Sequence, residues 1–180
     1  MLFDKTLVNI PRSPTSDILY LGMGGQTNNE VPLIVTKYLG SIRDGSNTNT
    51  NLKIGPFSLN DENDSLKVKI LGLDNEANPT SFVLSNLRNT LIQLMEPSYS
   101  ISDLAQATSV ISSLSPGLLP RGCGGLTFMD ELEFSFDFLR NLTSVNGKLA
   151  QEKMYIGTPS PPGCGAPSQY TIKLSIESHT

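Results

Sequence analysis

The clearest pattern in the sequence is an alternation of large apolar and polar residues between positions 131 and 138. The apolar positions are Leu132, Phe134, Phe136 and Phe138. Because successive side chains of a β-strand point to opposite faces, this pattern predicts a strand with one apolar and one acidic face. Asn146-Gly147 has the composition of a tight hairpin turn, so residues 148–156 are expected to return as the partner strand.

Further apolar runs predict additional strands before and after this hairpin. They lie at 18–21, 31–42, 52–59, 66–70 and 170–176. Gly22 to Gly25 are expected to form a turn, because the third glycine and the helix of a dinucleotide-binding loop are missing. Residues 44–51 contain no core-forming side chain and are expected to form a loop.

Two stretches carry apolar residues at helical spacing, 79–96 and 100–114. The first follows Asn78, a good N-cap residue, and Pro97 ends it. The second begins with a capping pair, Ser100 and Asp103. Together with the strands, these helices predict an α+β fold in which an antiparallel sheet or β-sandwich has two amphipathic helices packed on it.

The first 17 residues are expected to form an extended N-terminal arm, and residues 18–180 a single α+β domain. Pro11 and Pro14 prevent a regular helix in the arm. The arm also carries five apolar residues, which a disordered tail would not need. These are Leu2, Phe3, Leu7, Val8 and Ile10. We expect the arm to mediate self-association by adding to an open sheet edge of a neighbouring copy.

The chain has 180 residues, a formal net charge of −4 and only 17% charged residues. The negative net charge argues against a nucleic-acid-binding protein, because such proteins normally carry a positive surface potential that neutralises phosphates. A local basic face is expected at Lys53, Lys67 and Lys69. Neither an apolar run of bilayer-spanning length, roughly 20 residues, nor a signal peptide is recognised, so an intracellular location is expected.

Catalytic and metal-binding signatures are absent from the sequence. The two cysteines, Cys123 and Cys164, are each flanked by glycines; free thiols are favoured over a disulfide because of the expected reducing compartment. The single histidine, His179, lies one residue from the end of the given chain, a poor position for a general base. The acidic residues at 131, 133 and 137, Glu131, Glu133 and Asp137, are interpreted as the solvent-exposed face of a strand. No catalytic, cofactor or metal residue is predicted, and the protein is not expected to be an enzyme.

Three stretches give the chain a resemblance to the matrix proteins of nonsegmented negative-strand RNA viruses, of the rhabdovirus and paramyxovirus type. They are Tyr38-Leu39-Gly40-Ser41-Ile42-Arg43-Asp44 with Gly55-Pro56-Phe57-Ser58-Leu59, then Ser100–Leu114 with Leu132–Leu142, and Met154-Tyr155-Ile156-Gly157. The resemblance implies a non-enzymatic structural protein of the virion and host cytoplasm that links nucleocapsid and envelope. It implies a homo-oligomer, with nucleocapsid and a membrane surface as partners and no small-molecule substrate. The chain departs from the family in being acidic.

Two other classes of function stay open at this point. A capsid subunit, or a phage or bacterial assembly component of the tail or connector type, would suit the same low charge and proline-rich loops without a membrane role. An enzyme built from Asp, Ser and Tyr without a local signature is the third class. A basic surface patch would favour a matrix protein, and a jelly-roll topology would favour a capsid.

Overall fold

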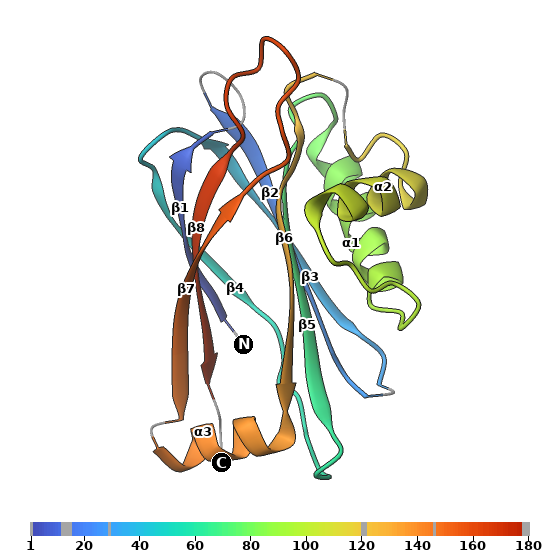
Figure 1. The fold of residues 1–180 in the computed structure, drawn as a ribbon, viewed down its shortest axis with the longest axis vertical. Coiled ribbons are helices and arrows are strands. Elements are labelled where there is room, and N and C mark those ends of the chain that lie inside the picture. Colours follow the sequence, from blue (N-terminus) through green and yellow to red (C-terminus); the bar gives the residue numbers. More distant parts are fainter. Residues whose placement is uncertain (1, 12–15, 29, 120–121, 146, 178–180) are drawn as a thin grey trace.

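The computed structural model describes residues 2–11, 16–28, 30–119, 122–145 and 147–177, with side chains described for all of these except 2–10 and 143–145. In this part of the chain, two four-stranded antiparallel sheets pack face to face as a β-sandwich (Figure 1). The elements are β1 (Leu2–Ile10), β2 (Asp17–Thr27), β3 (Leu33–Ile42), β4 (Asn47–Lys53), β5 (Ser65–Asp74), α1 (Thr80–Leu94), α2 (Leu104–Leu114), β6 (Gly125–Ser135), α3 (Phe136–Val145), β7 (Lys148–Ile156) and β8 (Gln169–Glu177). The predicted α+β fold is confirmed.

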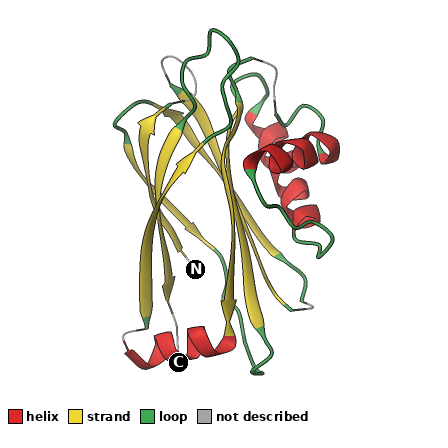
Figure 2. Cartoon of the chain, in the orientation of Figure 1, coloured by secondary structure: helices red, strands yellow, loops and turns green. Residues whose placement is uncertain are grey.

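The two sheets differ in what covers their outer faces. The sheet of order β3-β2-β5-β6 carries α1 and α2 on its outer face, and we term it the helix-covered sheet. The sheet of order β4-β1-β8-β7 has no described helix on its outer face, and we term it the open sheet (Figure 2). Helix α3 lies at one end of the sandwich and connects β6 to β7.

One hydrophobic core fills the space between the sheets. Side chains at alternate positions of β5, Leu66, Val68 and Ile70, point into it and are buried. From the open sheet, Tyr170 and Ile172 of β8 meet them. This alternation was visible in the sequence for both strands, so the predicted strands at 66–70 and 170–176 are confirmed.

A second core lies between the helix-covered sheet and its helices. Leu87 and Leu91 of α1 are fully buried against Leu71 and Leu73 of β5 within this cluster. A Cβ atom on Gly22 would lie 2.4 Å from Leu91 Cδ1, so the helix can approach β2 this closely only because position 22 is glycine. The predicted turn at Gly22 to Gly25 is therefore wrong, since these residues lie inside β2.

Both predicted helices are present, with ends within a few residues of the expected positions. Asp103 caps α2, because its carboxylate accepts a hydrogen bond from the backbone N–H of Gln106 at 2.8 Å. For α1, by contrast, Pro79 occupies the N-cap position and provides no side-chain hydrogen bond. Packing on the sheet, more than capping, therefore defines where α1 lies.

The predicted hairpin of residues 131–156 is wrong. Strand β6 ends at Ser135, and residues 136–145 form α3 instead of continuing the strand. Ser135 Oγ accepts a hydrogen bond from Phe138 N–H at 3.2 Å, so it acts as the N-cap of the helix. At the other end, Gly147 has φ +65° and donates its N–H to Leu142 O at 3.2 Å, as helix-terminating glycines do. Strand β7 consequently pairs with β8 and belongs to the other sheet.

Residues 44–59 also differ from the prediction. The expected loop contains β4, which pairs with β1, and the residues after Lys53 that were expected to form a strand have no strand structure. In β4, Thr50 and Leu52 are buried, while Asn49, Asn51 and Lys53 are exposed. A strand of this kind needs buried side chains on one face only. Because the residues on the exposed face of β4 are polar, the hydrophobicity of the segment did not reveal the strand.

The segment that was predicted to be an extended N-terminal arm contains a strand of the sandwich. Residues Leu2–Ile10 form β1, which lies between β4 and β8 and pairs with both. The segment is thus a central strand of the open sheet. Because both of its edges pair with other strands of the same chain, a neighbouring copy cannot add a strand to it. The side chains of Leu2, Phe3, Leu7, Val8 and Ile10 lie outside the described residues, and so do residues 12–15 of the expected arm.

Candidate assembly surface

The outer face of the open sheet is largely polar where its side chains are described. On β7 and β8 it carries cross-strand ion pairs, Lys148 with Glu177 at 2.9 Å and Glu152 with Lys173 at 3.9 Å. These pairs are solvent-exposed and contribute little stability. A face of this kind can stay in water, which explains why the chain needs no helix to cover it.

Two large apolar side chains on β7 break this polar pattern. Met154 is 57% exposed and Ile156 is 56% exposed, whereas Tyr155 between them is buried in the core. Because alternate residues of a strand share a face, Met154 and Ile156 stand side by side on the outer face. We term them the β7 apolar pair. Among the described strands, β7 pairs only with β8, so the pair lies on an edge strand.

Polar contacts to β6 hold this edge strand in place. Asp130 of β6 accepts hydrogen bonds from Lys153 Nζ at 2.8 Å and from Tyr155 Oη at 2.6 Å. Burial, together with the hydrogen bond to the Asp130 carboxylate and its charge, raises the pKa of the Tyr155 hydroxyl well above its ordinary value of 10.0. These contacts join the two sheets at the β6–β7 edge and fix the backbone that carries the β7 apolar pair.

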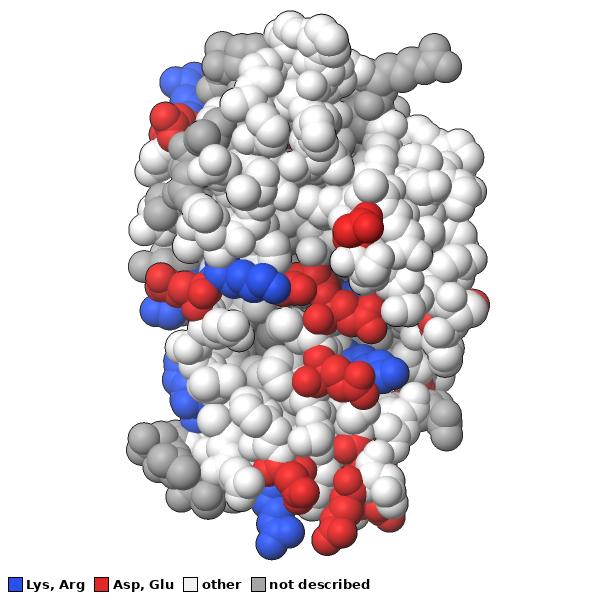
Figure 3. Space-filling model, viewed as in Figure 1, with Lys and Arg blue, Asp and Glu red and all other residues white. Residues whose placement is uncertain are grey.

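The charged groups on this side of the molecule form a band across its middle (Figure 3). The surface above the band is nearly free of charge; the loop at 157–168, which lies at that end of the sandwich, contains no charged residue. Below the band, acidic groups predominate. On the face shown in Figure 3, the two ends of the molecule therefore differ in charge.

A shallow groove lies near the acidic end, where β6 meets α3. It has a volume of about 460 Å³, and its lining residues are Ser65, Glu133, Phe134, Ser135 and Phe138. The rings of Phe134 and Phe138 stack with their centroids 5.8 Å apart, and Phe138 is 43% exposed. Ser65 Oγ donates a hydrogen bond to Glu133 at 2.9 Å. The groove thus has an aromatic wall and an acidic rim.

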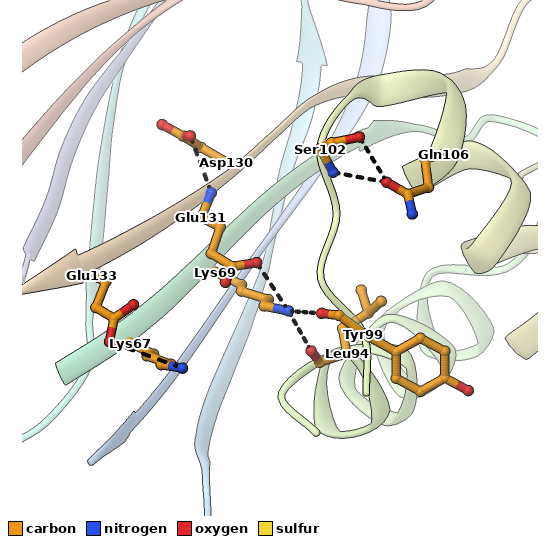
Figure 4. Close-up of polar contacts among 9 residues, drawn as sticks. All are labelled: Lys67, Lys69, Leu94, Tyr99, Ser102, Gln106, Asp130, Glu131 and Glu133. Atoms are coloured by element: carbon orange, nitrogen blue, oxygen red, sulfur yellow. Dashed lines mark hydrogen bonds and ion pairs between the residues drawn. The ribbon is translucent and has the colours of Figure 1, made fainter. Parts of the chain in front are cut away.

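The predicted basic face does not form. Lys69 is 3% exposed and lies beneath α1, where its ammonium group donates to Leu94 O at 2.6 Å and Tyr99 O at 2.5 Å and pairs with Glu131 at 3.1 Å (Figure 4). Lys67 is exposed but lies 3.9 Å from Glu133. Lys53 belongs to the other sheet. The alternation of β5 placed Lys67 and Lys69 on one face correctly, but it did not reveal that the end of α1 and the following loop cover Lys69.

The expectation of free thiols is also wrong. Cys123 and Cys164 form a disulfide with a Cα–Cα distance of 5.1 Å. Cys123 precedes β6 in the helix-covered sheet, and Cys164 lies in the loop between β7 and β8 of the open sheet. The sandwich brings these two loops together at one end, which spacing in the sequence could not reveal.

The described residues contain no cluster of three or more His, Cys, Asp or Glu side chains that could hold a metal ion. Glu131 and Glu133 lie on the outer face of β6 and are tied to Lys69 and Lys67, while Asp137 lies in the first turn of α3. His179 lies outside the described residues. Within the part of the chain that is described, the helices are too short or too polar to cross a membrane.

Comparison with protein-family models, with curated proteins and with solved structures finds no match for this chain. Its function must therefore be argued from its own surface.

Proposed function

We propose that this chain is a non-enzymatic structural protein that assembles with copies of itself, and that the β7 apolar pair is part of the contact. The supporting observation is the exposure of Met154 and Ile156, each more than half exposed, on an edge strand whose outer face has no other large apolar side chain. Because each is already partly buried, covering the exposed part of each side chain contributes roughly half of the 1.5–3 kcal/mol that full burial of such a side chain provides. An edge strand held by the Asp130 contacts also presents them in a fixed position, which lowers the entropic cost of binding.

The experiment is a comparison of molar mass by light scattering over a range of concentrations. Wild-type protein is expected to show a mass that rises with concentration. The double variant Met154→Asp/Ile156→Asp is expected to remain a monomer, because an interface that buries two unpaired carboxylates is strongly disfavoured. Phe82→Asp/Ile92→Asp is the matched control: these residues are 39% and 40% exposed on α1, so the variant also replaces two exposed apolar side chains by carboxylates but should leave assembly intact.

A matrix-like role in a virion, linking nucleocapsid to envelope, is the narrower form of this proposal. The sequence resemblance supports it. The disulfide counts against assembly in the host cytoplasm, where thiols are kept reduced, and the predicted basic face at Lys53, Lys67 and Lys69 does not form. A flotation assay with vesicles that contain anionic lipid tests the membrane part. Binding that falls with added salt is expected for a matrix protein; failure to float at any salt concentration would contradict it.

A subunit of a capsid, tail or connector is the alternative. The eight described strands in two four-stranded sheets favour it in part, because capsid jelly rolls share that architecture. Here, however, three pairs of strands that follow one another in the chain, β2–β3, β5–β6 and β7–β8, are direct neighbours within a sheet. In jelly rolls, successive strands mostly alternate between the sheets, so the strand order gives this alternative no further support.

A further inference from the structure

Helix α3 carries a sequence that is a substrate for covalent modification. Asn141, Leu142 and Thr143 form an Asn-x-Thr acceptor for N-linked glycosylation, in which the middle residue is not proline. An N-linked glycan is bulky and requires an asparagine that faces water. Asn141 is exposed at the end of the sandwich where α3 lies, whereas Leu142 is half-buried (Figure 1). The folded chain therefore has room for a glycan at position 141.

The disulfide is an independent observation about the compartment in which the chain folds. Disulfides form and persist in oxidising compartments and are rare where thiols are kept reduced. The bond between Cys123 and Cys164 therefore argues against the intracellular location that the sequence led us to expect. One oxidising compartment, the lumen of the endoplasmic reticulum, also contains the enzymes that glycosylate Asn-x-Thr sequences. A chain that acquires its disulfide there meets those enzymes on the same route.

A second acceptor sequence, Asn63-Asp64-Ser65, lies in a turn whose polar groups already bind one another. Asn63 Nδ2 donates a hydrogen bond to Asp61 Oδ1 at 2.9 Å, and Ser65 Oγ donates one to Glu133 Oε1 at 2.9 Å. The Asp64 carboxylate accepts the N–H of Asp61 at 3.0 Å. A glycan on Asn63 would have to fit into this hydrogen-bonded turn. The surroundings therefore favour Asn141 of the two sites.

An exposed aromatic ring lies one helical turn before Asn141. Phe138 and Asn141 are three residues apart in α3, so their side chains are neighbours on the helix surface. Side chains of a helix lean toward its N-terminus, which directs Asn141 toward Phe138. The Phe138 ring is 43% exposed and borders the groove together with Phe134. The C–H face of a sugar is apolar, so its contact with this ring would remove apolar surface of both from water.

We propose that Asn141 is an N-glycosylation site and that the first sugar of its glycan covers Phe138. In the transfer step, Asn141 Nδ2 attacks C1 of an oligosaccharide carried on a polyprenyl diphosphate. The bond between Nδ2 and C1 forms, the bond between C1 and the diphosphate oxygen breaks, Nδ2 loses one proton, and the polyprenyl diphosphate leaves. The inference does not depend on the proposed function, because it concerns α3 and not the β7 apolar pair.

Mass spectrometry of the protein isolated from its natural source tests the modification. The intact mass should exceed that of the sequence by the mass of an oligosaccharide. Peptide N-glycosidase should remove the excess and leave Asp in place of Asn141 in the peptide map. An intact mass equal to that of the sequence with one disulfide would overturn the inference, and so would a glycan found only at Asn63 or an excess mass that resists the enzyme.

Variants secreted from cultured animal cells test the contact between the sugar and the ring. Thr143→Ala should abolish the glycan while keeping Asn141, whereas the matched control Asn63→Gln should retain it. Phe138→Ala should lower the urea midpoint more in the glycosylated protein than in the Thr143→Ala background, because only the glycosylated protein has a sugar to cover the ring. Equal losses in both backgrounds would overturn the contact. Asn141→Gln replaces Thr143→Ala in this comparison if the latter does not fold.

Discussion

The two sheets of this molecule have equal numbers of strands, yet only one of them is covered by helices. On the helix-covered sheet, β2 and β5 are buried on both faces over most of their length, and the outward-facing Tyr20, Leu71 and Leu73 lie under α1 and α2. On the open sheet, β8 alternates over most of its length between a buried core face and a half-buried outer face. An apolar outer face is thus covered by helices of the same chain, whereas a polar outer face can remain in contact with water.

This comparison gives the β7 apolar pair its significance. The chain covers the apolar outer surface of one sheet with two helices, but it leaves Met154 and Ile156 exposed on the other. Scattered exposed apolar residues are ordinary on protein surfaces. Two neighbours on a fixed edge strand, with ion pairs around them, fit a contact that a second molecule completes.

Removing a side chain from the covered face is expected to have the largest effect on stability. Leu91→Ala should lower the free energy of unfolding by about 2–5 kcal/mol, because Leu91 is fully buried and a cavity would remain beside β2. Urea denaturation measures the change. The neighbouring Ile92→Ala, at a position 40% exposed, is the control and should cost much less.

A second substitution tests the close approach of α1 to β2 directly. Gly22→Ala alone should destabilise the protein, because the new methyl group would lie 2.4 Å from Leu91 Cδ1. In the Leu91→Ala background that clash is removed, so the same change should be better tolerated. Additive effects of the two substitutions would contradict the packing described for α1.

The disulfide joins loops from the two sheets, and breaking it is expected to have the next largest effect. Replacing both Cys123 and Cys164 by Ser should cost about 4 kcal/mol, as estimated from loop-closure entropy for a sequence separation of 41 residues. The free energy of unfolding under non-reducing conditions measures this. Unchanged stability, together with two titratable thiols in the native wild-type protein, would show that the bond does not form.

Two neighbouring lysines on β5 offer a comparison of covered and uncovered positions on one strand. Lys69→Met should cost about 1–3 kcal/mol, because it removes the donor to two backbone carbonyls beneath α1 and separates Glu131 from its ion pair. Lys67→Met should cost less than about 1 kcal/mol, because its ion pair is exposed. Equal costs would show that α1 does not cover Lys69.

The smallest expected effect is a dependence of stability on high pH. The raised pKa of Tyr155 means that the folded state keeps its phenol proton at a pH where the unfolded chain loses it. The unfolded state then binds fewer protons, so the stabilisation is complete below about pH 10 and declines as pH rises further. The difference between wild type and Tyr155→Phe should therefore be constant from about pH 8 to about pH 10 and should shrink as the pH rises to about 11. A constant difference across that range would contradict the contact with Asp130.

The sequence predicted those helices and strands whose apolar residues repeat at the spacing of the element itself. The apolar spacing of 79–96 and 100–114 and the alternation of 66–70 and 170–176 each depend on a face packed against a core, and all four elements are present. Helix α3 was missed because Phe134, Phe136 and Phe138 continue the alternation of β6. The N-cap Ser135 and the half-buried Phe136, Leu139 and Leu142, three residues apart, were the signals that could have revealed it.

The candidate assembly surface could not be predicted in the same way. Met154 and Ile156 have the spacing of a strand, but their exposure depends on whether β7 pairs with β6 or with β8 and on which face a helix covers. The groove depends on where β6 ends and α3 begins. These are relations between distant segments, and a single sequence does not carry them as a local pattern. The predicted basic face failed for the same reason.

Hydrogen–deuterium exchange of wild-type protein at low and high concentration tests most directly the claim that a second copy of the chain binds to β7 on the outer face of the open sheet. If the account is correct, exchange in peptides from β7 should slow as concentration rises, while exchange in α1 and α2 stays the same. Slower exchange confined to α1 and α2, or no dependence on concentration anywhere, would contradict it.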